Sequence, residues 1–208
     1  NFMKTFNKIL TLVLVVLFSN SFSAQITITP YYGGPNTTSV GLLADDNYLF
    51  EVYNTPMDID FSNLGPLGLT ASYTFDSKIA LGVDFNYTRC KASFDYFETS
   101  TDSISGDTYN MDAQRAVIRA MARFDAHFGD SERFDPYFSF GLGYRTTSTS
   151  YASDRPGFVE TPRETLIPLA LRLAFGTNIW IIDELGVLLE IGLGGGGLGR
   201  FGVTYRLQ

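Results

Sequence analysis

The sequence predicts an all-β fold: an eight-stranded antiparallel up-and-down transmembrane β-barrel with shear-tilted strands. Three observations predict it: an apolar leader, eight segments that alternate bulky apolar with small or polar residues, and connections that alternate in length. The alternation is clearest over residues 137–145, where Phe138, Phe140, Leu142 and Tyr144 form one row. Ser, Gly and Arg form the other row, because successive side chains of a strand point to opposite faces. Behind an export signal, such alternation is typical of a membrane barrel with its apolar row outward.

The leader, residues 1–24, is predicted to be a signal peptide. Lys4 and Lys8 precede a ten-residue apolar core, Ile9–Phe18. That core is too short for a membrane span, which needs about 20 residues. We expect cleavage after Ser23 or Ala24. Residues 25–208 are then a single barrel domain with no further domain after it.

The composition excludes several classes of protein. Removing Lys4 and Lys8 with the leader changes the net charge from −7 to −9, and such an acidic chain argues against nucleic acid as a partner. No apolar run after the leader is long enough for a helical span. Cys90 is the single cysteine, so no internal disulfide forms, and we expect a small buried or lumen residue there.

The first four strands are expected at 26–33, 67–75, 79–88 and 109–128. A short polar turn at 76–78 joins the second and third, which indicates a tight hairpin. The fourth is ambiguous, because Asp112 could cap a helix whose apolar residues fall near helical spacing. We prefer a strand, since the alternation keeps phase and the barrel must close with strands on both sides. Whether 112–128 is strand throughout stays open.

The last four strands are expected at 137–145, 164–179, 187–194 and 200–207. Short turns at 76–78, 129–135 and 183–185 would lie on one rim, and long polar loops at 35–63, 98–108 and 151–163 on the other. Outer-membrane barrels have this asymmetry, with short turns in the periplasm, so both termini are predicted to be periplasmic. Gly194–Gly197 forms a tight outer turn, and it lacks the Lys-Ser/Thr of a phosphate-binding loop.

Alternation alone would also fit a soluble, lipocalin-like barrel with its apolar row inward. A soluble exterior is rich in Lys and Glu, yet only Lys78 and Lys91 follow the leader. The interior of an eight-stranded barrel is only just wide enough for side chains. Rows of Phe, Leu, Ile and Tyr would overfill it, so these rows are assigned to lipid.

The inward row then carries charges, which must be paired in a narrow interior; Arg on the lipid face at mid-membrane would cost about 2–4 kcal/mol. We predict a lumen network of salt bridges that plugs the barrel, and expect Arg200 and Arg206 to be rim charges. The predicted network comprises Asp84, Arg119, Arg123, Asp125, Arg145, Arg172 and Glu190.

Aromatic residues near the strand ends are expected to form interfacial girdles. They are Phe75, Phe128, Tyr205, Tyr32, Tyr87 and Tyr144. For Trp180, a place in the girdle and a place filling the mouth of the lumen both stay open.

The segments 136–144, 186–192 and 202–207 resemble strands of the small outer-membrane barrels of the OmpA/OmpX type. The resemblance spans the chain after the leader, although the chain ends on Leu207-Gln208 where many such proteins end on Phe. It implies a porin-like barrel. We expect no cell-wall tether of the OmpA type, because no peptidoglycan-binding domain follows the predicted eighth strand. Longer third to sixth strands resemble the protruding sheet of the OmpX type.

We expect a non-enzymatic structural or surface-interaction role through acidic extracellular loops, with no catalytic residue, metal or cofactor. A small-solute pore is the alternative. A lipid A-modifying enzyme is less favoured, because His127, the only histidine, lies at the periplasmic end beside Asp125. The expected partners are outer-membrane lipid, lipopolysaccharide and the barrel-assembly machinery of a Gram-negative bacterium. We expect a monomer, and no extracellular partner is identified.

Overall fold

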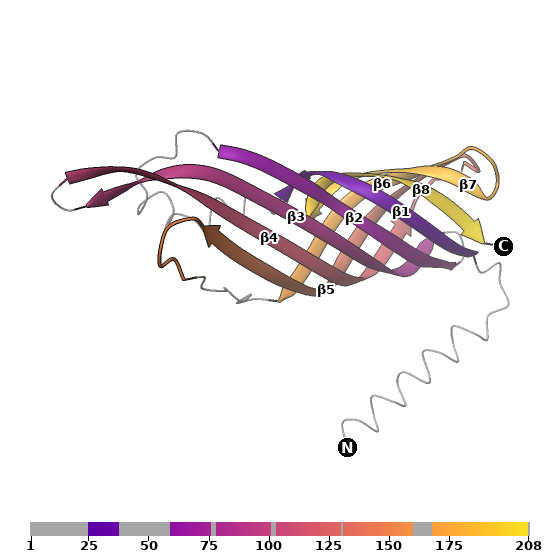
Figure 1. Ribbon diagram of the computed structural model, residues 1–208. Helices are drawn as coiled ribbons and strands as arrows, with labels where there is room; N and C mark the ends of the chain where they lie inside the picture. Colours follow the sequence, from indigo (N-terminus) through magenta and orange to yellow (C-terminus); the bar gives the residue numbers. More distant parts are fainter. Residues whose placement is uncertain are drawn as a thin grey trace, which may run out of the picture.

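A closed barrel of eight antiparallel strands forms the protein in its computed structural model, with β1 pairing to β8 (Figure 1). The structure describes residues 25–37, 59–75, 78–100, 103–129, 131–159 and 168–207. The predicted signal peptide, 1–24, and most of the predicted loop 35–63 lie outside these residues. No helix in the described ranges is long and apolar enough to cross a membrane.

The strands follow one another around the barrel in chain order. They are β1 (Gln25–Asn36), β2 (Ile59–Phe75), β3 (Ile79–Ser100), β4 (Ser103–His127), β5 (Phe134–Ser153), β6 (Leu169–Trp180), β7 (Leu185–Gly194) and β8 (Gly197–Leu207). Every predicted strand is therefore present, and the ambiguous 112–128 segment is strand as far as His127.

The predicted loop at 98–108 is wrong, because β3 and β4 continue as a hairpin to Ser100 and Ser103. The predicted loop at 35–63 is also too long, since β2 begins at Ile59 and passes through a register shift between Leu64 and Leu67. A polar stretch of sequence forms a loop only where the backbone is no longer paired with a neighbouring strand. Here cross-strand hydrogen bonds persist beyond the apolar pattern, as β-forming Thr, Ile and Tyr permit.

The strands extend much farther at one end of the barrel than at the other (Figure 1). At the end we name the turn end, short connections join β2 to β3, β4 to β5 and β6 to β7, and β1 begins and β8 ends there. At the other, the loop end, β2, β3, β4 and β5 extend beyond the closed barrel. β1 pairs with β2 only as far as Leu67, and β6 pairs with β5 only as far as Tyr144. The long polar extension is thus built on one side of the barrel.

The outside of the barrel is apolar over a limited height. Phe85, Ile118 and Leu142 are about half exposed on the outward rows of β3, β4 and β5. Beyond Tyr144 and its neighbours the same rows become polar, with Arg89 and Lys91 on β3 and Thr and Ser on β5. An apolar belt about nine residues long along β3 matches the 9–11 residues with which a tilted strand crosses a bilayer.

Candidate functional site: a charged network across the lumen

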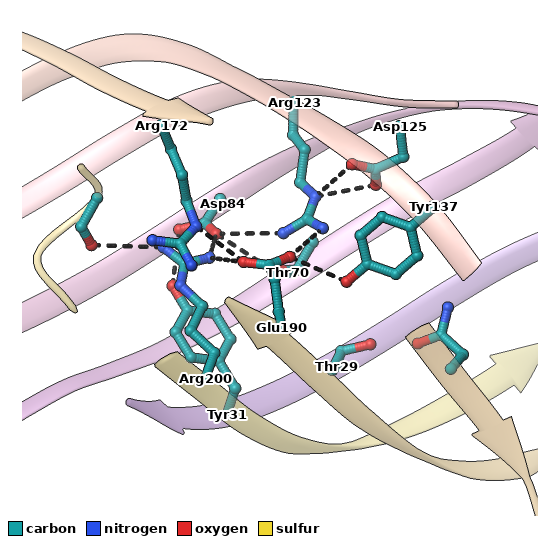
Figure 2. A network of polar contacts seen from close by, with 12 residues as sticks. Thr29, Tyr31, Thr70, Asp84, Arg123, Asp125, Tyr137, Arg172, Glu190 and Arg200 are labelled. Atoms are coloured by element: carbon teal, nitrogen blue, oxygen red, sulfur yellow. Dashed lines mark hydrogen bonds and ion pairs between the residues drawn. The ribbon is translucent and has the colours of Figure 1, made fainter. Parts of the chain in front are cut away.

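Charged side chains meet in the middle of the lumen, where they come from the inward rows of five strands. Asp84 lies on β3, Arg123 on β4, Arg172 on β6, Glu190 on β7 and Arg200 on β8 (Figure 2). Each alternates with outward apolar neighbours, so the same period that exposes the belt directs these groups inward. All five are at most 6 % exposed.

Glu190 is the acceptor that joins most of the network. Its Oε2 accepts hydrogen bonds from Arg123 Nη2 at 2.6 Å and from Tyr137 Oη at 2.9 Å. Its Oε1 accepts one from Arg172 Nε at 2.8 Å and lies 3.7 Å from Arg200 Nη1. One buried carboxylate therefore faces three guanidinium groups.

Asp84 forms a second centre on the opposite wall. Its Oδ1 accepts hydrogen bonds from Tyr31 Oη at 2.8 Å and Asn86 Nδ2 at 3.0 Å. Its Oδ2 accepts one from Thr70 Oγ1 at 3.3 Å and is ion-paired to Arg200 Nη1. Arg123 Nη1 lies 3.9 Å from the same oxygen, so Arg123 and Arg200 link the two carboxylates.

Asp125 completes the charge balance of this network. Arg123 Nε donates to Asp125 Oδ1 at 2.8 Å and to Oδ2 at 2.9 Å. Asp84, Asp125 and Glu190 thus face Arg123, Arg172 and Arg200, three charges of each sign. Such groups are stable out of water only when they are paired and hydrogen-bonded. Every charge here has an oppositely charged partner, and of the guanidinium nitrogens of these three arginines only Arg172 Nη2 and Arg200 Nε are buried without a hydrogen bond among the described residues.

Two buried tyrosines frame the network, and each lies over a glycine of the neighbouring strand. Tyr31 pairs with Gly68 and Tyr137 with Gly176. A Cβ on Gly68 would lie 2.4 Å from the Tyr31 ring, and one on Gly176 would lie 2.5 Å from the Tyr137 ring. Arg200 stacks 4.3 Å from the centre of the Tyr31 ring, which adds a cation–π contact to its ion pairs.

Two arginines of the predicted network lie nearer the loop end. Arg119 is buried and donates from Nη1 to Thr88 Oγ1 at 2.8 Å and to Asn86 Oδ1 at 3.3 Å. Arg145 is half-buried and lies directly across from Arg119 in the β4–β5 register. The structure therefore brings Asp84, Arg123, Asp125, Arg172 and Glu190 together, connects Arg119 through Asn86, and places Arg145 beside Arg119.

Arg200 is not a rim charge, and that expectation is wrong. Its side chain is fully buried and lies opposite Glu190 in the β7–β8 register. The pair follows from the hairpin centre, because Glu190 and Arg200 each lie five residues from Gly195. Tyr31 and Tyr137 were not predicted to join the network, because they carry no charge and take part through their hydroxyl groups.

A polar cavity of about 480 Å³ lies between the network and the turn end. Arg123, Asp125 and Tyr137 line its inner part, and Thr and Ser side chains of β1 and β2 line its wall. His127 Nδ1 lies 2.7 Å from Asp135 Oδ1, so its partner is Asp135 and not the expected Asp125. We name this cavity the vestibule.

Trp180 also lines the vestibule and is 5 % exposed, so it fills the mouth and does not join the aromatic girdle. Arg206 lies over its ring, 3.7 Å from the centre, and donates to Asp183 O at 3.4 Å near the turn end. Cys90 is fully buried beside Ala92 and Ala113 in the extended sheet. Among the residues that the structure describes, no group of His, Cys, Asp and Glu is arranged to hold a metal ion.

An apolar belt outside and paired charges inside are the reverse of a soluble barrel. Together with the closed antiparallel sheet, they define the chain as a transmembrane β-barrel with the architecture of small outer-membrane barrels. The lipocalin-like alternative is excluded because the bulky rows face outward.

Solved structures with this architecture match the chain at low identity. The N-terminal barrel domain of OprF from Pseudomonas aeruginosa is 10% identical, with a TM-score of 0.42 over 88% of this chain and 97% of that one. Ail of Yersinia pestis is 12% identical, with a TM-score of 0.42 over 88% and 96%. Neisserial surface protein A is 12% identical, with a TM-score of 0.37 over 88% and 96%. No protein-family model and no curated protein matches the chain.

Proposed function

We propose that this protein is a non-enzymatic integral barrel of the Gram-negative outer membrane, with a sealed lumen and a loop end that makes surface contacts. The observation that carries the sealed lumen is that every strand contributes to the network. Tyr31, Thr70, Asp84, Arg123, Tyr137, Arg172, Glu190 and Arg200 come from β1 to β8 in turn. A layer tied to the whole circumference leaves little room for a continuous water path.

Conductance tests the sealed lumen directly. The purified chain should migrate differently in gels before and after heating, which reports a folded barrel, and should show no discrete openings in planar bilayers. Openings by the folded wild-type protein would contradict the sealed lumen. They would support the second candidate, a small-solute pore, which the 480 Å³ vestibule favours.

The surface role is supported by the extension of β3, β4 and β5 beyond the apolar belt. There the outward row is polar, and Lys91 Nζ pairs with Asp112 Oδ2 at 3.0 Å. Of the acidic residues predicted in the first outer loop, Asp60 lies exposed on β2, and Asp45, Asp46, Glu51 and Asp58 lie outside the described residues. In this proposal the extension stands above the lipopolysaccharide layer, the barrel is monomeric, and the barrel-assembly machinery inserts it.

A lipid A-modifying activity is disfavoured by the place of His127. Its imidazole contacts Asp135 and lines the vestibule at the turn end, far from the outer leaflet if both termini are periplasmic. Expression of the chain should leave the mass spectrum of lipid A unchanged. A new lipid A species would contradict the non-enzymatic role.

A further inference from the structure

The turn between β7 and β8 lies inside the barrel, although turns of that kind usually project into solvent. Gly195, Gly196 and Gly197 are all buried. The carbonyl oxygens of Gly194 and Gly197 accept hydrogen bonds from Arg172 Nη1 at 2.8 and 2.9 Å. The charged network thus holds the turn in place through Arg172, on the side of the turn that faces the network.

The turn reaches the opposite wall of the lumen. A Cβ placed on Gly196 would lie 2.5 Å from Arg119 Nη1 and 2.8 Å from Thr88 Oγ1, and these residues belong to β4 and β3, across the ring from β7 and β8. Gly196 O also accepts a hydrogen bond from Thr37 N at 3.0 Å. The turn is therefore anchored on several sides of the barrel.

Only glycine fits along this path. Gly194, Gly195 and Gly196 have φ of 79°, 62° and 94°, which side chains rarely adopt. A Cβ on Gly197 would lie 2.7 Å from the ring of Pro66, itself fully buried on β2. The four glycines give the backbone a cross-section small enough to enter the lumen.

We propose that Gly194–Gly197 is a stopper that closes the loop end of the lumen above the charged network, and that its release turns the vestibule into a channel for small hydrophilic solutes. This inference deepens the proposed sealed lumen and rests on it. The vestibule already opens a polar path from the turn end to the network. The turn lies on the far side of Arg172 and Arg200 and accepts hydrogen bonds from both side chains. Displacing it therefore removes the outer barrier and also takes away partners that hold these two arginines in the sealing network.

Gly196→Val tests the stopper, with Gly157→Val as the matched control. Gly157 also has a positive φ, 82°, but a Cβ there would meet nothing within 4 Å. Both variants place a side chain at a positive φ, and only the first inserts volume between the turn and the wall. In planar bilayers, Gly196→Val should show discrete openings that wild type and Gly157→Val lack. A folded, heat-modifiable Gly196→Val barrel without openings would overturn the stopper.

If Gly196→Val does not fold, a second pair of variants tests the stopper. Arg172→Gln removes the two hydrogen bonds to the turn and one contact with Glu190. Arg123→Gln also removes a contact with Glu190, and none of its described hydrogen bonds reaches the turn. Openings in Arg172→Gln alone support the stopper, and equal behaviour of the two variants overturns it. Channel openings in the wild-type protein would instead contradict the proposed sealed lumen. A higher frequency of openings in Gly196→Val than in the wild type would in that case still support the stopper.

Discussion

Glu190 shows how single inward residues determine the interior of this barrel. Its side chain is fully buried, and Arg123, Tyr137 and Arg172 donate to it. Removing one partner of a buried ionic cluster leaves the other charges unpaired in a low-dielectric site. The free energy of unfolding should therefore respond to Glu190 far more than to an exposed carboxylate.

Glu190→Gln is expected to lower the free energy of unfolding by about 3–5 kcal/mol, because three guanidinium groups lose their shared anion. Urea unfolding in lipid vesicles, followed by the fluorescence of the single tryptophan, measures the change. Asp112→Asn is the control, since the Lys91–Asp112 pair is more than a third exposed and should contribute under about 1 kcal/mol. An equal loss of unfolding free energy in the two variants would show that the buried network stabilises the barrel no more than an exposed ion pair does.

At the scale of one strand, β5 passes from lipid to water without a break in its hydrogen bonding. Phe138, Phe140 and Leu142 are exposed on its outward row, and Thr146 and Ser148 continue the same row beyond the belt. The pairing with β4 continues to Ser153. Only the polarity of the outward side chains changes, so the outward row of β5 by itself indicates where the strand leaves the membrane.

Leu142→Arg should lower the free energy of unfolding in lipid by about 2–4 kcal/mol, because it places a charge on the lipid face within the belt. Ser148→Arg, on the same row and outside the belt, should change it by less than about 1 kcal/mol. Reversible unfolding in phospholipid vesicles compares the two. Similar costs at both positions would place the bilayer elsewhere on the barrel.

At the scale of the whole molecule, the sheet closes into a ring whose two ends are unlike. β1 begins and β8 ends at the turn end, whereas the extended sheet lies at the loop end (Figure 1). Gly157, in the connection after β5, is exposed at the loop end. The short turns of outer-membrane barrels face the periplasm, so this shape predicts the orientation in the membrane.

An epitope inserted after Gly157 should bind antibody on intact cells. An epitope appended after Gln208 should bind only after the outer membrane is permeabilised, because the end of β8 lies at the turn end. Immunofluorescence of whole and permeabilised cells distinguishes the two sites. Labelling of the Gln208 epitope on intact cells would reverse the predicted orientation.

The scarcity of lysine and the narrow interior of an eight-stranded barrel assigned the bulky rows to lipid, and so placed Asp84, Arg123, Asp125, Arg172 and Glu190 inward. The alternation of side chains by itself determined most of the strands and the two rows of each strand. This succeeds because the period of two is a local property of extended backbone. The ambiguous 112–128 segment needed the closure of the ring as well as its alternation, since a helix there would have interrupted the ring. Strand ends were less predictable, because polar β3 and β4 residues pair beyond the pattern.

Tertiary structure alone decided which inward groups meet. Arg123 and Glu190 are 67 residues apart, and their contact depends on ring closure and on the register of every strand between them. The same closure buries Arg200, seats Tyr31 and Tyr137 over glycines, and carries the Gly194–Gly197 turn to the opposite wall. The alternation in the sequence specifies which face of a strand a side chain is on. The height of that side chain along the barrel, and its distance from side chains across the lumen, are fixed only when all eight strands are paired in register.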